Sequence, residues 1–167
     1  EIEFWAIHAR MLLHDHACLQ NIPVFCCNTI GFGTRLFFFP PHAMSMAECL
    51  GLTLQEAQGL EERMRTKTAS SEDMRTVMHR MITRFLPEEQ EYSADPKGEA
   101  SVSATHRRLE HEGRASIIAT NPPLATGFVA DHVLLYLLRN SGVERTIVPP
   151  PPMPGYLFFD AAKMSAK

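Results

Sequence analysis

Apolar residues recur at two different spacings along the chain, and the spacing predicts which segments are helices and which are strands. Over residues 2–20 the apolar positions recur every three to four residues, which predicts a first helix. Aromatic and β-branched residues then dominate, and they predict two strands, 24–29 and 34–39, on either side of a turn that contains Gly31 and Gly33. The first forty residues therefore predict a helix followed by a hairpin.

Three N-terminal signals predict three further helices. Ser45 with Glu48, and Thr53 with Glu56, have the spacing of a capping box, in which the hydroxyl accepts a backbone N–H and the carboxylate reaches back. Ser70 opens the third of these helices. Its apolar residues fall on one side of the helix, and they are Met74, Val77, Met78, Met81, Ile82 and Phe85.

The second half of the chain begins with polar residues that offer little to bury. Residues 87–113 predict a long surface loop or an extended arm. A strand over 115–120, a helix over 126–140 and a strand over 144–148 follow in the order of a parallel crossover unit. Residues 149–152 are prolines, which cannot donate ladder hydrogen bonds and therefore end the last of these strands.

The late helix and the C-terminus complete the predicted elements. Residues 156–159 predict a final strand, and 161–167 predict a loose tail. The helix over 126–140 is expected to keep one polar side and to bury its apolar residues, which include Phe128, Val133, Leu134, Leu137 and Leu138.

Together these elements predict an α+β fold. We expect about five helices and four or five short strands in a small mixed sheet, with a long polar loop and a proline-rich C-terminal extension. Residues 1–86 would form a lobe of helices and a hairpin, 87–113 a polar linker or arm, and 114–167 a strand–helix–strand lobe with a polyproline tail. A single domain over the whole chain is the alternative.

Composition and charge exclude some classes of partner. The 167 residues are 45% hydrophobic and 21% charged, as is usual for a globular protein. The net charge of −3 provides no basic excess for phosphate, so we expect no direct contact with nucleic acid. The most apolar segment, 115–138, is interrupted by Pro122, Pro123 and Asp131, which argues against a transmembrane span but leaves peripheral membrane association open.

The cysteines and histidines offer no complete metal site. Cys18, Cys26, Cys27 and Cys49 lack the paired spacing of a zinc knuckle, and we expect reduced, mostly buried thiols. His14 lies four residues before Cys18 on one side of a helix, but further ligands would have to come from distant sequence. The sequence therefore predicts neither a metal nor a cofactor.

One short motif points to an enzyme. Asn121-Pro122-Pro123-Leu124 follows an apolar strand and resembles the Asn-Pro-Pro-aromatic motif of S-adenosylmethionine-dependent methyltransferases that modify exocyclic amino groups. The resemblance implies that Asn121 and a prolyl carbonyl would accept hydrogen bonds from the target nitrogen, although Leu124 replaces the aromatic. The cofactor turn of that family would be Gly31-Phe-Gly33, where Cys26 and Cys27 replace the usual acidic residue. This predicts a degenerate methyltransferase-like enzyme as one alternative; two prolines that merely open a helix are the other.

The polar arm and the polyproline segment favour a different function, a non-catalytic accessory or structural subunit of a larger multiprotein assembly. Proline-rich segments are stiff and lie extended over a neighbour at low entropic cost. A transient adaptor would share these features. The chain begins at Glu1 rather than Met, which would fit an intracellular, mitochondrial protein after removal of a presequence. The predicted partner-binding residues are Pro149, Pro150, Pro151, Pro152, Tyr156, Phe158 and Phe159.

Overall fold

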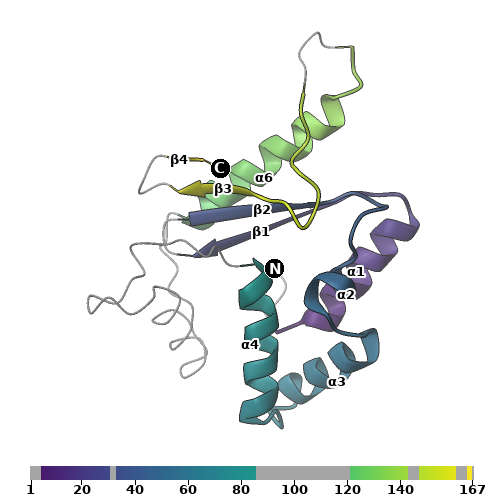
Figure 1. The fold of residues 1–167 in the computed structure, drawn as a ribbon, viewed down its shortest axis with the longest axis vertical. Coiled ribbons are helices and arrows are strands. Elements are labelled where there is room, and N and C mark those ends of the chain that lie inside the picture. The colour runs from purple at the N-terminus through teal and green to yellow at the C-terminus, as the bar shows by residue number, and fades with distance from the viewer. Residues whose placement is uncertain (1–4, 31–32, 86–120, 143–146, 161–164, 167) are drawn as a thin grey trace.

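A computed structural model describes residues 5–30, 33–85, 121–142, 147–160 and 165–166 of the chain (Figure 1). The described helices are α1 (Ile7–Leu19), α2 (Met46–Leu50), α3 (Leu54–Arg65), α4 (Ser71–Phe85) and α6 (Asn121–Leu138). The described strands are β1 (Val24–Ile30), β2 (Gly33–Phe39), β3 (Leu157–Asp160) and β4 (Ser165–Ala166).

The four strands form one sheet in the order β1-β2-β3-β4. β1 and β2 pair over their whole length, with Val24 opposite Phe39. β3 joins the other edge of β2 and places Phe158 opposite Arg35. The C-terminal part of the chain therefore completes a sheet that begins near the N-terminus.

β2 lies in the middle of the molecule and is buried along its whole length. Successive side chains of a strand point to opposite faces of the sheet. Phe37 and Phe39 pack with residues of α1 to α4, whereas Phe38 meets Tyr136 of α6 with ring centroids 5.3 Å apart. The sheet thus separates α6 from the layer formed by α1 to α4 (Figure 1).

The main hydrophobic core lies between the sheet and the layer of α1 to α4. Met11 of α1 and Val77 of α4 are fully buried in it, so the same core fixes two helices that are distant in sequence. Burial of a side chain of this size contributes roughly 1.5–3 kcal/mol. The buried members of this core are Ile7, Met11, Phe37, Phe39, Met46, Cys49, Leu50, Leu52, Ala57, Leu60, Val77 and Met153.

The two predicted capping boxes at α2 and α3 are confirmed. Ser45 Oγ accepts the N–H of Glu48 at 3.1 Å, and Glu48 Oε2 accepts the N–H of Ser45 at 2.7 Å. Thr53 and Glu56 make the same pair of bonds at 3.2 and 2.8 Å. These bonds favour the ionised carboxylate, so they lower the pKa of both glutamates.

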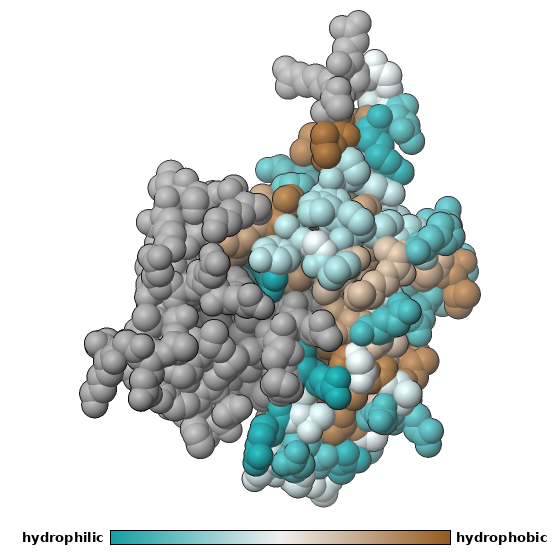
Figure 2. Space-filling model, in the orientation of Figure 1, coloured by the Kyte–Doolittle hydropathy of each residue, from teal (hydrophilic) through white to brown (hydrophobic). Residues whose placement is uncertain are grey.

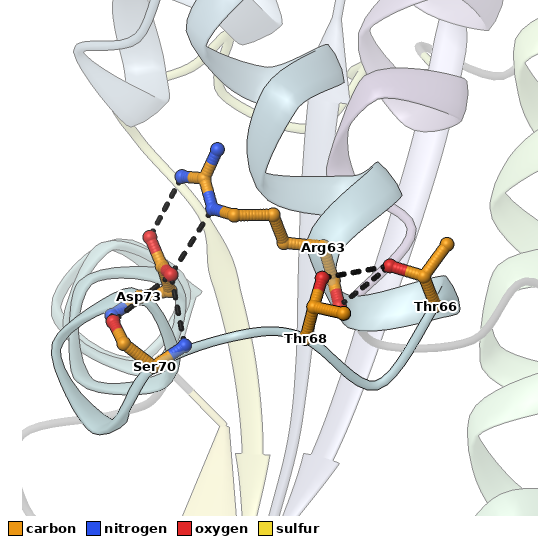
Figure 3. Close-up of polar contacts among 5 residues, drawn as sticks. All are labelled: Arg63, Thr66, Thr68, Ser70 and Asp73. Atoms are coloured by element: carbon orange, nitrogen blue, oxygen red, sulfur yellow. Dashed lines mark hydrogen bonds and ion pairs between the residues drawn. The ribbon is translucent and has the colours of Figure 1, made fainter.

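Asp73 of α4 connects the end of α3 to the start of α4 through hydrogen bonds (Figure 3). Arg63 Nε and Nη2 donate to its two carboxylate oxygens at 3.0 and 2.7 Å. The backbone N–H and the hydroxyl of Ser70 both donate to Asp73 Oδ2 at 2.9 Å, while Ser70 Oγ accepts the N–H of Asp73 at 3.0 Å. The Arg63 guanidinium and Ser70 hold the pKa of Asp73 well below its usual range. α4 therefore begins with a box in which aspartate replaces glutamate.

The proline-rich segment that follows α6 returns to the edge of β2. The N–H of Met153 donates to the carbonyl of Phe38 at 2.8 Å, and Met153 is buried in the main core. At Gly155 a Cβ would lie 2.9 Å from Pro151 Cβ, so this turn requires glycine. The segment then continues into β3.

The predicted α+β class is confirmed, and the described residues contain five helices and four strands. The described strands pair antiparallel, and the single parallel contact among the described residues joins Phe38 and Pro152; the strands expected to pair in parallel, 115–120 and 144–148, lie wholly or partly outside the described residues. Residues 147 and 148 are not in a strand, because the prolines after them cannot propagate a ladder. The tail predicted to be loose contains β4, which pairs with β3.

Three sequence predictions concern residues outside the described part of the chain. They are the strand over 115–120, the start of the strand over 144–148, and the arm over 87–113. Of the predicted C-terminal lobe, α6 and β3 pack on the strands of the N-terminal lobe.

Replacing Ser70 with Ala should lower the free energy of unfolding by about 1 kcal/mol, because α4 loses its N-cap hydroxyl. Ser71→Ala changes the neighbouring exposed serine, which is inside α4, and should alter stability by less than about 0.5 kcal/mol. Urea unfolding followed by circular dichroism measures both values. Equal losses in the two variants would show that the Ser70–Asp73 contact does not stabilise the connection between α3 and α4.

Candidate protein interface on helix α6

α6 is the longest helix in the described part of the chain and has two prolines, Pro122 and Pro123, in its first turn. Proline fits the first turn of a helix, because the N–H groups there have no intrahelical partner. At the other end, the carbonyl of Leu138 accepts the N–H and the hydroxyl of Ser141 at 3.0 and 2.7 Å. Gly142 follows with a φ of 78°, which favours glycine after a helix.

Aromatic contacts fix the inner side of α6 against the sheet. The ring of Tyr136 meets Phe25 of β1 at 5.7 Å and Phe38 of β2 at 5.3 Å. Phe128 meets Phe159 of β3 at 6.4 Å. Three strands therefore contact one side of α6, which fixes the direction in which its opposite side points.

The opposite side of α6 exposes Leu124, Leu134 and Leu138, and its two flanks expose Leu135 and Leu137. Their exposed fractions are 39% for Leu124, 59% for Leu134, 45% for Leu135, 67% for Leu137 and 42% for Leu138. We call these five residues the leucine surface. Figure 2 shows exposed hydrophobic residues, in brown, around the upper end of α6. A helix that is apolar on all sides is normally buried on all sides, so the leucine surface has the character of a contact surface.

A single charged residue interrupts the leucine surface. Asp131 is the only Asp, Glu, Lys or Arg between Asn121 and Leu138. Its side chain is exposed and belongs to none of the ion pairs among the described residues. None of the helices in the described ranges has both the length and the apolar character needed to cross a membrane.

The aromatic residues predicted to bind a partner take part in the fold of the chain itself. Phe158 and Phe159 are half-buried in β3, where Phe159 contacts α6. Tyr156 is 38% exposed, and the guanidinium carbon of the buried Arg35 lies 3.4 Å from the centroid of its ring. Such a contact shields the cation with an aromatic face.

The predicted proline contacts divide between the interior and the surface. Pro150 is buried, whereas Pro149, Pro151 and Pro152 are exposed. Because Pro152 also bridges to Phe38, the backbone of this segment is fixed on the sheet. The exposed prolines present a stiff, preformed strip at the surface.

The residues of the methyltransferase-like motif lie in the first turn of α6. Pro123 and Leu124 are exposed there. Of the suggested cofactor turn, Gly31 lies outside the described residues, and Gly33 is buried at the start of β2 opposite Ile30. The structure places the motif at the start of α6 and Gly33 at the start of β2, two elements that contact each other.

A small pocket of about 50 Å³ lies beside the end of α1, lined among others by His14, Asp15, Cys18, Phe39 and Ser45. This volume holds a few water-sized groups and is far too small for a nucleoside. The rings of His14 and Phe39 meet edge-on at 4.6 Å. Burial, together with the nearby Arg10, lowers the pKa of His14 to about 4. His14 is therefore neutral at pH 7.

The structure brings together only some of the residues that the sequence suggested as metal ligands. His14 and Cys18 both line the small pocket, and the Cys18 thiol donates to the carbonyl of Pro41. His42 is exposed, while Cys49 is buried in the main core. Within the described ranges, no three His, Cys, Asp or Glu residues are grouped closely enough to hold a metal ion.

The adjacent cysteines of β1 point to opposite faces of the sheet, as the sequence predicted for a strand. Cys26 packs against the main core, and Cys27 lies on the α6 side. Burial raises the pKa of both thiols, that of Cys27 to about 12. Both are therefore protonated at neutral pH and are poor nucleophiles.

Comparisons with protein-family models, with curated proteins and with solved structures found no match to this chain.

The leucine surface was missed by the sequence analysis, which expected Leu134, Leu137 and Leu138 to be buried and a polar side to be exposed. That expectation is wrong, because Phe128 and Tyr136 occupy the inner side and the leucines lie outside. A signal was present in the sequence: a segment of 18 residues with one charge has too few polar residues to form a polar side.

Lowering the pH from about 6.5 to about 4 should destabilise the protein partly through His14. Over this range the unfolded chain protonates His14 while the folded chain does not, so the unfolded state binds more protons and stability falls. His14→Phe keeps a ring against Phe39. The wild type should lose of the order of 2 kcal/mol of its free energy of unfolding through His14 over this pH range, allowing for solvent screening, and the variant should not.

The measurement is urea unfolding of wild type and variant at a series of pH values between 7 and 4. His16→Phe makes the same change at an exposed histidine and should retain the slope of the wild type. An unchanged slope in His14→Phe would show that His14 is not the group responsible.

Proposed function

We propose that this chain is a non-catalytic subunit of a multiprotein assembly and that the leucine surface of α6 is its contact with a neighbouring subunit. One observation carries the proposal: four leucines within five consecutive positions, 134–138, are 42–67% exposed. Exposed apolar patches of this kind mark interaction surfaces on soluble proteins.

The energetics of burial favour a contact that extends beyond the leucine surface. Completing the burial of a half-exposed leucine contributes about 1 kcal/mol, so four of them contribute of the order of 4 kcal/mol. Association costs at least that much in lost translational and rotational freedom. The leucine surface is therefore suited to be the apolar centre of a larger interface, surrounded by polar contacts.

The surroundings of α6 also support this role. Tyr136 is held by Phe25 and Phe38, so α6 is fixed before any partner arrives. A preformed surface loses little conformational entropy when it binds a partner. The exposed Pro149 and Pro151 belong to a segment whose neighbour Met153 is anchored in the core, and they extend the rigid surface of the chain.

In its native cells, a tagged copy of the chain should elute in size-exclusion chromatography as a particle much larger than the 18.8 kDa chain. Leu134→Glu combined with Leu137→Glu should release it from that particle, because two charges in an apolar interface cost several kcal/mol. Mass spectrometry of the fractions identifies the subunits that are lost together with it.

The matched control is Leu12→Glu combined with Leu13→Glu, which changes two adjacent leucines of α1 that are 47% and 57% exposed. This variant should stay in the particle, and both variants should retain the circular dichroism of the wild type. Elution of the wild type as a single chain, or retention of the α6 variant in the particle, would contradict the proposed function.

A further inference from the structure

We infer that the leucine surface receives a helix of another protein that carries one basic residue within an otherwise apolar stripe. This inference rests on the proposed function and specifies the chemistry of the partner.

The spacing of the outward positions of α6 is that of a coiled-coil seam. Leu124, Gly127, Asp131, Leu134 and Leu138 follow one another at intervals of three, four, three and four residues. All five positions are exposed. A stripe with this spacing packs against another helix, whose ridges enter the grooves between its side chains.

The positions that face the sheet belong to the other side of α6. Ala125 is 6% exposed, and Phe128 and Tyr136 contact the strands. The seam is therefore not used for packing within the described chain. Nothing lies within 4 Å of where a Cβ would stand on Gly127, so the seam has a depression at this position. A bulky side chain of a partner helix would fill this depression between the ridges of Leu124 and Leu134.

Asp131 decides which helix can occupy the seam. It lies midway between Leu124 and Leu138, and the described residues provide it with no ion pair. A carboxylate that becomes buried without a partner costs several kcal/mol. A single polar residue at such a position selects the partner and fixes its register. The occupant therefore needs a Lys or Arg opposite Asp131.

The same residue disfavours a second copy of this chain. Because Asp131 is the midpoint of the seam, two copies that align Leu124–Leu138 would bring the two Asp131 carboxylates together in both parallel and antiparallel orientation. Like charges at a buried contact are strongly unfavourable. A membrane surface is disfavoured too, since interfacial helices carry Lys and Arg, whereas Asn121–Leu138 contains neither.

Two synthetic helical peptides test the inference. Each has 18 residues and a leucine stripe with the same three-four spacing, and they differ only in a central stripe residue that is Lys in one and Glu in the other. We expect the full chain to bind the Lys peptide at least about fivefold more tightly than the Glu peptide in fluorescence anisotropy titrations. Asp131→Lys should reverse this preference, and Asp131→Asn should abolish it.

Matched controls separate the seam from general charge effects. Glu72→Lys makes the same change in net charge at an exposed residue of α4 and should keep the wild-type preference. Leu12→Glu with Leu13→Glu should keep it as well, whereas Leu134→Glu with Leu137→Glu should abolish binding of both peptides.

Equal binding of the two peptides, or a preference that Asp131→Lys does not reverse, overturns the inference. So does the absence of binding at peptide concentrations up to about 100 µM. If sedimentation velocity shows self-association that Asp131→Asn strengthens, the occupant is a second copy and the inference fails. Flotation with phosphatidylcholine vesicles that depends on Leu134 and Leu137 would assign the surface to lipid and would also overturn it.

The two proposals fail separately. If the α6 leucine variant leaves the native particle but the peptides show no charge preference, the proposed function stands and the basic helix is wrong. If that variant stays in the particle, the proposed function is wrong whatever the peptides do.

Discussion

The burial of β2 on both faces is the constraint on which the rest of the structure depends. All seven of its residues are buried, and its aromatic side chains alternate between two cores. Phe37 and Phe39 require the layer of α1 to α4, and Phe38 requires α6. β1 and β3 then pair with the two edges of β2 and provide hydrogen-bond partners for its backbone. Segments that are distant in sequence meet because this one strand must be enclosed.

The exposure of the leucine surface follows from the way in which α6 covers its face of the sheet. Its aromatic residues, Phe128 and Tyr136, fill the space beside the rings of β1, β2 and β3. Once they define the inner side, the helical period directs Leu134 and Leu138 outward. A helix that only covered the sheet would carry charged residues on that outer side. The leucines of the outer side therefore do not pack α6 onto the sheet, which supports the proposed contact with another subunit.

Elements whose signals are local could be predicted from the sequence. The capping boxes of Ser45 and Thr53 depend on residues three positions apart, and the hairpin depends on composition around one turn, so neither needs knowledge of tertiary structure. The orientation of α6 could not be predicted, because its apolar residues lack a clear period and aromatic partners on distant strands choose its inner side. β4 was missed because two residues form a strand only when β3 is already in place.

Several charged groups in the described residues stabilise the ends of helices. Glu48, Glu56 and Asp73 cap the starts of α2, α3 and α4. The capping bonds are the main cause of the lowered pKa of Glu48 and Glu56, whereas the pKa of Asp73 is lowered first by Arg63 and then by Ser70. Glu61 accepts the N–H of Ala9 at 3.1 Å and thereby supplies α1, whose own N-cap is an alanine, with an acceptor.

Arg80 performs the corresponding task at a helix C-terminus, where it donates to the carbonyl of Leu50 at 3.2 Å. Asp131 differs from all of these, because it lies ten residues into α6 and therefore cannot neutralise a helix end. It also interrupts the most apolar helix of the described chain at the middle of its outward stripe, where an isolated carboxylate weakens any purely apolar contact. A charge that stabilises no helix end and weakens apolar association supports the proposed basic residue on a partner helix.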